Sequence, residues 1–305
     1  MASWQSILLK WVFRRRMRRR RAVEDRFDIT KARANLEAMS AQIPPAADLK
    51  NEPFTLNGLP AEWITPPVVT RNRVLLYLHG GGYTIGSINT HRNLAGSIAR
   101  AAEARALLIE YRLAPESKFP AAVEDSVEAY HWLLANQFDP GQIFLAGDSA
   151  GGGLTLATLI SLRDAREPMP AAAICLSPWT DLAGTGESMV TNAKADPWLD
   201  PEGLIPAGQL YLGGADPRTP LASPLYADLA GLPPLLIQVG TAEILLSDST
   251  RLAEKAEAAG VDVTLEVWDG MMHVFQAFSS RIPEGKKAVR SIGAFIKKHA
   301  AQPVF

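Results

Sequence analysis

A Gly-x-Ser-x-Gly pentapeptide at residues 147–151 is the segment whose residue types and spacing point most directly to chemistry. It follows an expected strand, 142–146, and precedes an expected helix, 151–162. A sharp turn from strand to helix brings the backbone close to its neighbours, so side chains two positions on either side of the serine would collide. The pattern also fits a helix that begins with an N-capping serine. Its place between strand and helix favours the turn, and we expect Ser149 to be a nucleophile.

A serine hydroxyl is a weak nucleophile unless a nearby base accepts its proton. After a turn of this type the partners follow in the chain order serine, acid, histidine. Three histidines precede Ser149 and a fourth lies in the expected C-terminal helix: these are His79, His91, His131 and His299. The fifth, His273, lies in a loop after the expected strand 263–267. We therefore expect His273 to be the base.

The acid is expected near the carboxyl end of the preceding strand, 234–239, because ligands of open α/β sheets gather at that edge. The first carboxylate after this strand belongs to Glu243, and Asp248 follows five residues later. Asp248 fits better as the cap of an expected helix over 250–259. We expect Glu243 to accept the imidazole N–H and so to fix the tautomer of His273.

Acyl transfer also needs hydrogen-bond donors aimed at the oxyanion that develops on the substrate. Residues 79–83 read His-Gly-Gly-Gly-Tyr directly after the expected strand 73–78, and consecutive glycines can turn their N–H groups toward a substrate. The N–H of Ala150 is a further donor. A glycine run can also cradle phosphate, but the sequence contains neither Gly-x-x-x-x-Gly-Lys-Ser/Thr nor Gly-x-Gly-x-x-Gly. We expect His79 to brace this loop and not to act as a second base.

The elements that position these residues alternate short apolar runs with helical patterns from about residue 50 onward, which predicts a parallel sheet flanked by helices. Several runs are apolar without alternation, as in strands covered on both faces. Two segments fall outside the alternation, 1–45 and 179–229, and the second is rich in Pro, Gly and Asp. Insertions of this kind often build a lid or a binding surface. The expected strands are 73–78, 106–111, 142–146, 171–176, 234–239 and 263–267.

The composition of the 305-residue chain, 47% hydrophobic and 21% charged, excludes wholesale disorder. The single cysteine, Cys175, excludes an internal disulfide and a cysteine-based metal cluster and suits a reducing cytosol. The N-terminus does not match a secretory signal, because its arginines follow its apolar stretch instead of preceding it. That stretch, 4–13, is also too short to span a bilayer. We expect a cytoplasmic protein.

The charge of the chain is distributed unevenly. Residues 1–26 contain nine basic and two acidic side chains, net +7, whereas the other 279 residues contain 22 basic and 30 acidic ones, net −8. Any attraction to an anionic membrane or to nucleic acid must therefore come from the N-terminus. We do not expect nucleic-acid binding, because no aromatic platform or recognition motif accompanies the basic run.

The role of residues 1–21 has two alternatives. Apolar side chains on one face of the expected helix precede the arginines; they are Trp4, Ile7, Leu8, Trp11 and Val12. This face fits a cap helix that covers the active site while the arginines are solvated. It also fits peripheral contact with a membrane.

Four segments in order resemble the motifs of the hormone-sensitive-lipase-like carboxylesterases, the bacterial family IV esterases of the α/β-hydrolase superfamily. The similarity covers roughly residues 40–300. The segments are 79–83, Tyr-Arg-Leu-Ala-Pro-Glu at 111–116 with Phe-Pro-Ala-Ala at 119–122, Gly-Asp-Ser-Ala-Gly-Gly at 147–152, and Met-His-Val-Phe at 272–275.

This resemblance implies an α/β fold: an eight-stranded, mostly parallel sheet with helices on both faces and a helical cap. The cap would consist of residues 1–45 and the insertion 179–229, and the catalytic domain would span 46–305. By position, the resemblance implies that Ser149 is the nucleophile and His273 the base. It also implies that the backbone N–H groups of Gly81, Gly82 and Ala150 are the oxyanion donors.

The family hydrolyses short- to medium-chain acyl esters without metal or cofactor, so we expect a small-molecule ester substrate, an acyl-enzyme intermediate and no bound metal. One departure concerns the acid: most of the family carries Asp-Pro-Leu where this chain has Glu-Ile-Leu at 243–245. This chain resembles a subgroup with glutamate there. An amidase or peptidase, which shares the first half-reaction, stays open, as does a non-catalytic binding protein on the same fold. The sequence leaves homo-oligomer formation open.

Overall fold

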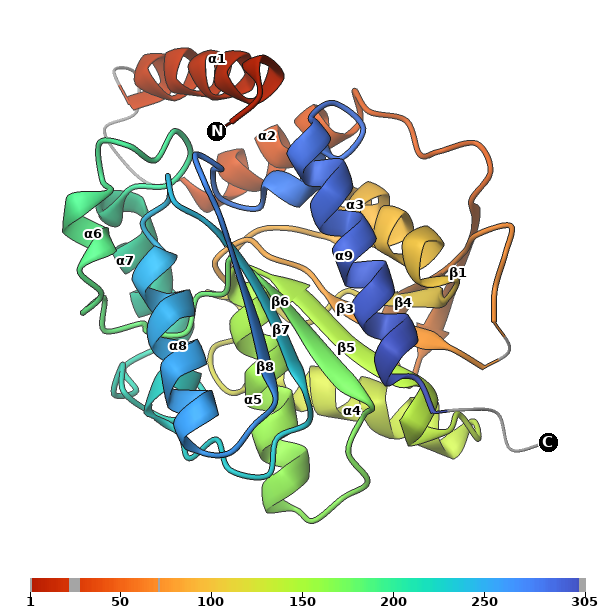
Figure 1. Cartoon of the computed structure of the whole chain (residues 1–305). Coiled ribbons are helices and arrows are strands. Elements are labelled where there is room, and N and C mark those ends of the chain that lie inside the picture. Colours follow the sequence, from red (N-terminus) through yellow and green to blue (C-terminus); the bar gives the residue numbers. More distant parts are fainter. Residues whose placement is uncertain (1, 22–27, 71, 302–305) are drawn as a thin grey trace.

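The computed structural model describes residues 2–21, 28–70 and 72–301, which include an eight-stranded sheet (Figure 1). The strand order is β1-β2-β4-β3-β5-β6-β7-β8, in which β2 is antiparallel to both neighbours and β3 to β8 are parallel. This arrangement confirms the expected fold class. The strands are β1 (Lys50–Leu56), β2 (Leu59–Thr65), β3 (Val74–Leu78), β4 (Arg105–Ile109), β5 (Ile143–Asp148), β6 (Ala172–Leu176), β7 (Leu235–Gly240) and β8 (Val263–Trp268).

Helices cover both faces of the sheet. One face packs against α3 and α9 and the other against α4, α5 and α8 (Figure 1). The helices are α1 (Trp4–Arg21), α2 (Ile29–Ser40), α3 (Ile88–Ala102), α4 (Ala121–Ala135), α5 (Ala150–Asp164), α6 (Ser188–Thr191), α7 (Pro201–Leu212), α8 (Leu246–Ala258) and α9 (Pro283–His299). Short 3-10 turns occur at Pro140–Gln142, Pro224–Tyr226 and Phe275–Phe278.

The two faces of the sheet explain why its central strands are continuously apolar. Every residue of β3 is buried. Leu75 and Tyr77 pack on the side of α3 and α9, whereas Val74 and Leu76 pack on the other side. Alternate residues of a strand point to opposite faces, so a strand covered twice needs an apolar residue at every position.

The six strands expected from the sequence are confirmed with shifts of one or two residues at their ends, and two more strands, β1 and β2, were not found by the apolar pattern. β1 is an edge strand with exposed positions and contains Pro53, so it lacks an apolar run. A turn at Asn57 and Gly58 joins β1 to β2, with φ of 45° and 91°. Asn-Gly with two positive φ angles is a strong hairpin signal, and it could have predicted this pair of strands.

The segments outside the alternating pattern form separate helices. Residues 1–45 contain α1 and α2, and residues 179–229 contain α6, α7 and a 3-10 turn. The division of the chain into a cap and a catalytic domain stays a prediction. No helix in the described ranges is both long enough and apolar enough to cross a membrane.

Candidate active site

Ser149 occupies the sharp turn between β5 and α5. Its φ of 54° and ψ of −121° lie in a region that side chains rarely adopt. A Cβ atom on Gly147 would overlap the carbonyl of Gly151, and one on Gly151 would overlap the carbonyl of Leu78. The steric reason expected for both glycines is therefore confirmed. The turn is held by hydrogen bonds from Ser149 N to Leu176 O (2.8 Å) and from Trp179 N to Ser149 O (2.9 Å).

His273 and Glu243 lie together at the same edge of the sheet. His273 follows β8 and Glu243 follows β7, and the imidazole Nδ1 is 2.8 Å from the carboxylate Oε2. The other carboxylate oxygen accepts hydrogen bonds from Gly240 N (2.7 Å) and Ser177 Oγ (2.9 Å). Both side chains are buried. The carboxylate is therefore held in one orientation against the imidazole.

Ser177 is a residue of this site that the sequence interpretation missed. It follows β6 and has a φ of 46°. Its hydroxyl donates to Glu243 and accepts from Val274 N (3.1 Å), so it connects the carboxylate to the residue after His273. Its place at the carboxyl end of a central parallel strand is the signal that could have identified it.

The environment of His273 favours its protonated form. Burial opposes a charge on the imidazole, but the hydrogen bond and negative charge of Glu243 outweigh it, with contributions from Asp196 and Asp148, and the pKa of His273 is raised. A carboxylate on Nδ1 stabilises the imidazolium that forms when Nε2 takes up a proton.

A second buried carboxylate, Asp196, lies close to this pair. Its Oδ2 accepts from Ile244 N (3.0 Å), directly after Glu243, and its Oδ1 accepts from Trp198 N (2.8 Å) and Leu199 N (2.9 Å). Burial raises the pKa of Asp196 to about 6, although the nearby His273 lowers it. Asp196 thereby connects the 179–229 insertion to the backbone directly after the candidate acid.

Asp248 has a different place from the one expected. Helix α8 begins at Leu246, so Asp248 lies in its first turn and does not cap a helix that starts at 250. Its carboxylate accepts from Thr180 N (2.8 Å) and Asp181 N (3.0 Å). Burial raises the pKa of Asp248 to about 7. The capping interpretation was wrong because the sequence pattern could not show this contact with the 179–229 insertion.

The glycine loop 79–83 lies next to the serine turn. Gly81 and Gly82 have φ of 118° and 62°, which glycine adopts without strain. Ala150 is the first residue of α5, so its N–H has no partner within the helix. Among the described residues, the N–H groups of Gly81, Gly82 and Ala150 donate to no protein acceptor. All three are therefore unpartnered within the part of the chain that the structure describes.

A buried polar network lies under both loops. Asp148 accepts from Tyr77 OH (2.7 Å) and Gly80 N (3.2 Å), and its other oxygen is 3.4 Å from His91 Nε2. Burial opposes charge on both groups, but their mutual attraction lowers the pKa of Asp148 and raises that of His91. This ion pair, which the sequence interpretation missed, connects α3 to the residue before Ser149, and the hydrogen bond from Gly80 N connects the glycine loop to the same carboxylate.

His79 is placed as expected for a bracing residue. Its ring stacks on Tyr111 with centroids 4.2 Å apart, and its Nδ1 is 2.8 Å from Gly80 O. Burial and the nearby His91 lower the pKa of His79 to about 3, so the ring stays neutral.

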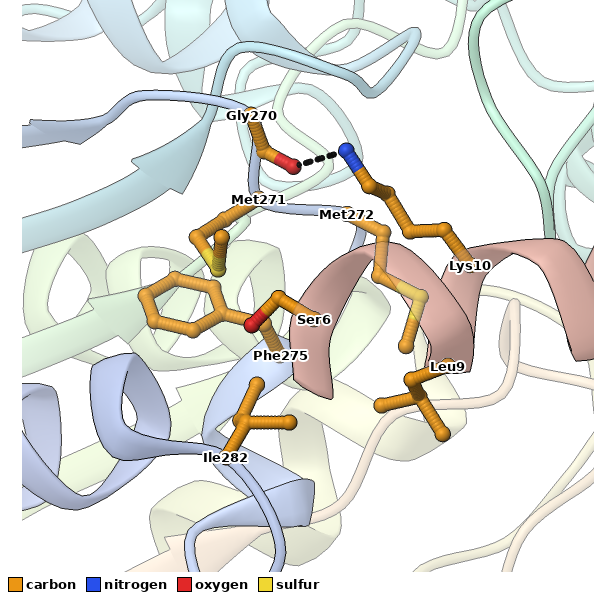
Figure 2. Close-up of a pocket in the computed structure, with 8 residues that line it drawn as sticks. All are labelled: Ser6, Leu9, Lys10, Gly270, Met271, Met272, Phe275 and Ile282. Atoms are coloured by element: carbon orange, nitrogen blue, oxygen red, sulfur yellow. Dashed lines mark hydrogen bonds between the residues drawn. The ribbon is translucent and has the colours of Figure 1, made fainter. Parts of the chain in front are cut away.

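Helix α1 packs against the loop that carries His273 (Figure 2). Ser6, Leu9 and Lys10 face residues 270–272, with Phe275 and Ile282 beside them. The Lys10 ammonium donates to Gly270 O (2.7 Å). In the described ranges, no group of three His, Cys, Asp or Glu side chains is arranged to hold a metal ion.

The sequence matches the family described as alpha/beta hydrolase fold over residues 75–277. It is 49% identical to a protein named acetyl-hydrolase from Streptomyces hygroscopicus, over 80% of this chain and 81% of the relative. A crystal structure titled as an esterase from the bacterial hormone-sensitive lipase (HSL) family has a TM-score of 0.93 at 50% identity, covering 99% of this chain and all of that one. EstE5, which was soaked with p-nitrophenyl butyrate, gives 0.93 at 47% identity with the same coverage.

Proposed function

The chain belongs to the bacterial hormone-sensitive lipase family of α/β-hydrolase esterases, and from this premise we propose that it cleaves its substrate with Ser149 as nucleophile, His273 as base and Glu243 as acid. The protein is a carboxylic ester hydrolase. The observation that carries the proposal is the buried 2.8 Å hydrogen bond between His273 and Glu243, at the edge of the sheet where Ser149 lies.

In the first half-reaction the Ser149 hydroxyl attacks the ester carbonyl carbon, and its proton passes to Nε2 of His273. The Nδ1–H of His273 is directed to Glu243, which stabilises the imidazolium. The new oxyanion accepts hydrogen bonds from the N–H groups of Gly81, Gly82 and Ala150. The carbon–oxygen bond to the leaving group then breaks, the alcohol departs with the proton from His273, and an acyl-serine remains.

In the second half-reaction a water molecule takes the place of the alcohol. His273 removes a proton from the water as it attacks the acyl carbon, and the same donors bind the second oxyanion. Collapse of this intermediate returns the proton to the Ser149 oxygen and releases the carboxylic acid. The steps use only protein groups and water.

We propose short- to medium-chain acyl esters as substrates and a cap formed by α1, α2 and the 179–229 insertion. The p-nitrophenyl butyrate soak of EstE5 and the name acetyl-hydrolase support this chain length. In a pocket of limited depth each added methylene contributes about 0.8 kcal/mol until the pocket is full. Catalytic efficiency should rise from acetate to butyrate or hexanoate and fall by dodecanoate. A continued rise through dodecanoate would contradict the limited pocket.

The test of the reaction class compares p-nitrophenyl butyrate with the matched p-nitroanilide, without added metal. We expect efficient hydrolysis of the ester, much slower hydrolysis of the anilide and almost complete loss of both in Ser149→Ala. A faster anilide reaction would favour the amidase alternative. A wild-type chain that binds the ester without hydrolysing it would favour a binding protein.

A further inference from the structure

Helix α1 has an inner face that attaches it to the rest of the chain. Ser6 Oγ donates to Glu284 Oε2 (2.7 Å). Lys10 Nζ donates to Gly270 O (2.7 Å), as Figure 2 shows. The Phe13 ring stacks on Trp198, with centroids 4.9 Å apart. The helix is therefore held against the molecule by this face, and Arg14, further along the helix, also donates to Ala195 O (2.8 Å).

The outer face of α1 carries large apolar side chains that are exposed. Trp4, Ile7, Leu8 and Trp11 have exposed fractions of 70%, 56%, 51% and 55%. The other large hydrophobic side chains exposed in the described ranges are far apart in the sequence: Ile43, Val68, Val190, Ile205 and Val267. The alternative in which this apolar face covers the active site is wrong, because these four side chains are exposed and different residues of α1 make the contacts.

Clustered apolar side chains on a surface helix mark an interaction site. The four residues of the outer face follow one another at spacings of three or four positions, Trp4 to Ile7 and Leu8, and these two to Trp11. They therefore lie along one continuous line of the helix. Two of the four residues are tryptophans, which prefer the boundary between the hydrocarbon and the polar headgroups of a bilayer.

Positive charge continues from the outer face along the same helix. Arg14 and Arg15 are exposed, and the Arg15 guanidinium lies 5.4 Å from the centre of the Trp11 ring. The sequence of α1 contains five more arginines, Arg16 and Arg18 to Arg21. Residues 1–26 have a net charge of +7 against −8 for the rest of the chain. An apolar stripe followed by arginines is complementary to anionic lipid, which offers both acyl chains and negative headgroups.

Two other binding partners, a second copy of the chain and nucleic acid, fit this face less well. A second copy of the chain would bring two arginine-rich helices together, and these repel each other. Nucleic acid offers phosphates but no partner for Ile7 and Leu8. We propose that the outer face of α1, formed by Trp4, Ile7, Leu8 and Trp11, binds an anionic lipid surface.

This attachment would also orient the enzyme. α1 lies outside the edge of the sheet at which the strands end, and it contacts Gly270 just after β8 (Figure 1). Ser149, Glu243 and His273 lie at ends of strands on this edge. A membrane bound to the outer face therefore lies on the same side of the molecule as these residues. The proposal rests on α1 alone and does not depend on the assignment of the triad.

The experiment measures sedimentation of the full chain with vesicles of equal parts phosphatidylglycerol and phosphatidylcholine, and with vesicles of phosphatidylcholine alone. We expect binding to the anionic vesicles, little binding to the neutral ones, and release at high salt, because the Debye length falls to about 3 Å near 1 M. Trp4→Gln/Ile7→Gln/Trp11→Gln should weaken binding by about tenfold or more, because it removes most of the apolar outer face.

The matched control is Val68→Gln/Val190→Gln, which removes exposed apolar side chains elsewhere and should bind as the wild type does. Both variants should hydrolyse p-nitrophenyl acetate normally, which shows that they are folded. Absence of binding by the wild type, or equal binding by the triple variant, would overturn the proposal. A wild-type dimer that the triple variant converts to a monomer, with vesicle binding unchanged, would assign the outer face to a second copy.

Discussion

Ser177 Oγ lies 2.9 Å from Glu243 Oε1 and accepts the N–H of the residue that follows His273. One hydroxyl therefore fixes the candidate acid relative to the loop of the candidate base. Ser177, Glu243 and Val274 follow β6, β7 and β8, which are neighbouring strands in the sheet. The contacts of the hydroxyl therefore join the chain segments at the ends of three adjacent strands. We infer that the alignment of Glu243 with His273 depends on this hydroxyl as well as on their own hydrogen bond.

Replacement of Ser177 should therefore affect the chemical step. Ser177→Ala removes a donor from Glu243 and an acceptor from Val274 N, and we expect kcat to fall by about tenfold with KM little changed, because misplacement of a catalytic group costs rate more than binding. Steady-state kinetics with p-nitrophenyl butyrate measure both constants. Ser161→Ala is the control, because its hydroxyl donates to Ala157 O within α5, away from Glu243 and His273. Unchanged kcat in Ser177→Ala would show that the hydroxyl does not position the pair.

The two carboxylates after β7 should have different importance for the reaction. We expect Glu243→Gln to lower kcat by at least about 100-fold, because an amide cannot stabilise the imidazolium as the carboxylate does. Asp248→Asn should cost much less, since its carboxylate bonds to Thr180 N and Asp181 N. Circular dichroism on both variants checks that they are folded. The reverse ranking would move the role of acid to Asp248.

The pH dependence of the reaction should follow His273. The base must be neutral to accept the serine proton, and the pKa of His273 is raised above its ordinary value of 6.5. Activity should therefore be present at high pH and fall as the pH decreases, with a midpoint above 6.5 in kcat/KM, which reports the free enzyme. A flat profile from about pH 5 to 8, or a midpoint below the ordinary histidine value, would contradict His273 as the base.

Helix α1 supports the loop before His273, so loss of α1 should reduce activity. Deletion of residues 1–21 removes the packing of Ser6 and Leu9 on this loop and the bond from Lys10 to Gly270 O. We expect kcat/KM for p-nitrophenyl butyrate to fall by about tenfold or more, because His273 would be held less tightly. Trp4→Gln/Ile7→Gln/Trp11→Gln is the matched control, since it changes the outer face alone and should stay fully active. Full activity of the truncated chain would show that α1 does not support the site.

The sequence contained most of what was needed to place Ser149, because the glycine pattern and the adjoining strand and helix are local features. The central strands were found for the same reason: burial on both faces makes them apolar at every position. β1 was not predicted, because an edge strand with exposed positions and a proline has no continuous apolar run. Its Asn57-Gly58 turn was the better signal.

Other features depend on contacts between distant segments. Ser177 and Asp196 meet the Glu243 loop only after folding, and no periodicity shows this. The orientation of α1 also depends on contacts with residues that are distant in the sequence. Its apolar face fitted either a cap over the active site or contact with a membrane, and the structure shows that Ser6 and Lys10 attach the opposite face through hydrogen bonds to Glu284 and Gly270. Polar contacts with distant residues therefore determine which face of α1 packs against the molecule, and the hydrophobic pattern alone does not show this.

The most direct test of the proposed mechanism is the site of covalent labelling by a fluorophosphonate, which reacts with an activated serine as an ester substrate does. Peptide mapping by mass spectrometry should find one adduct, on Ser149, with loss of esterase activity in proportion to labelling. Ser149→Ala should give no adduct, and His273→Ala should react far more slowly. An adduct on another residue that accounts for the lost activity, or an active Ser149→Ala enzyme, would contradict the account.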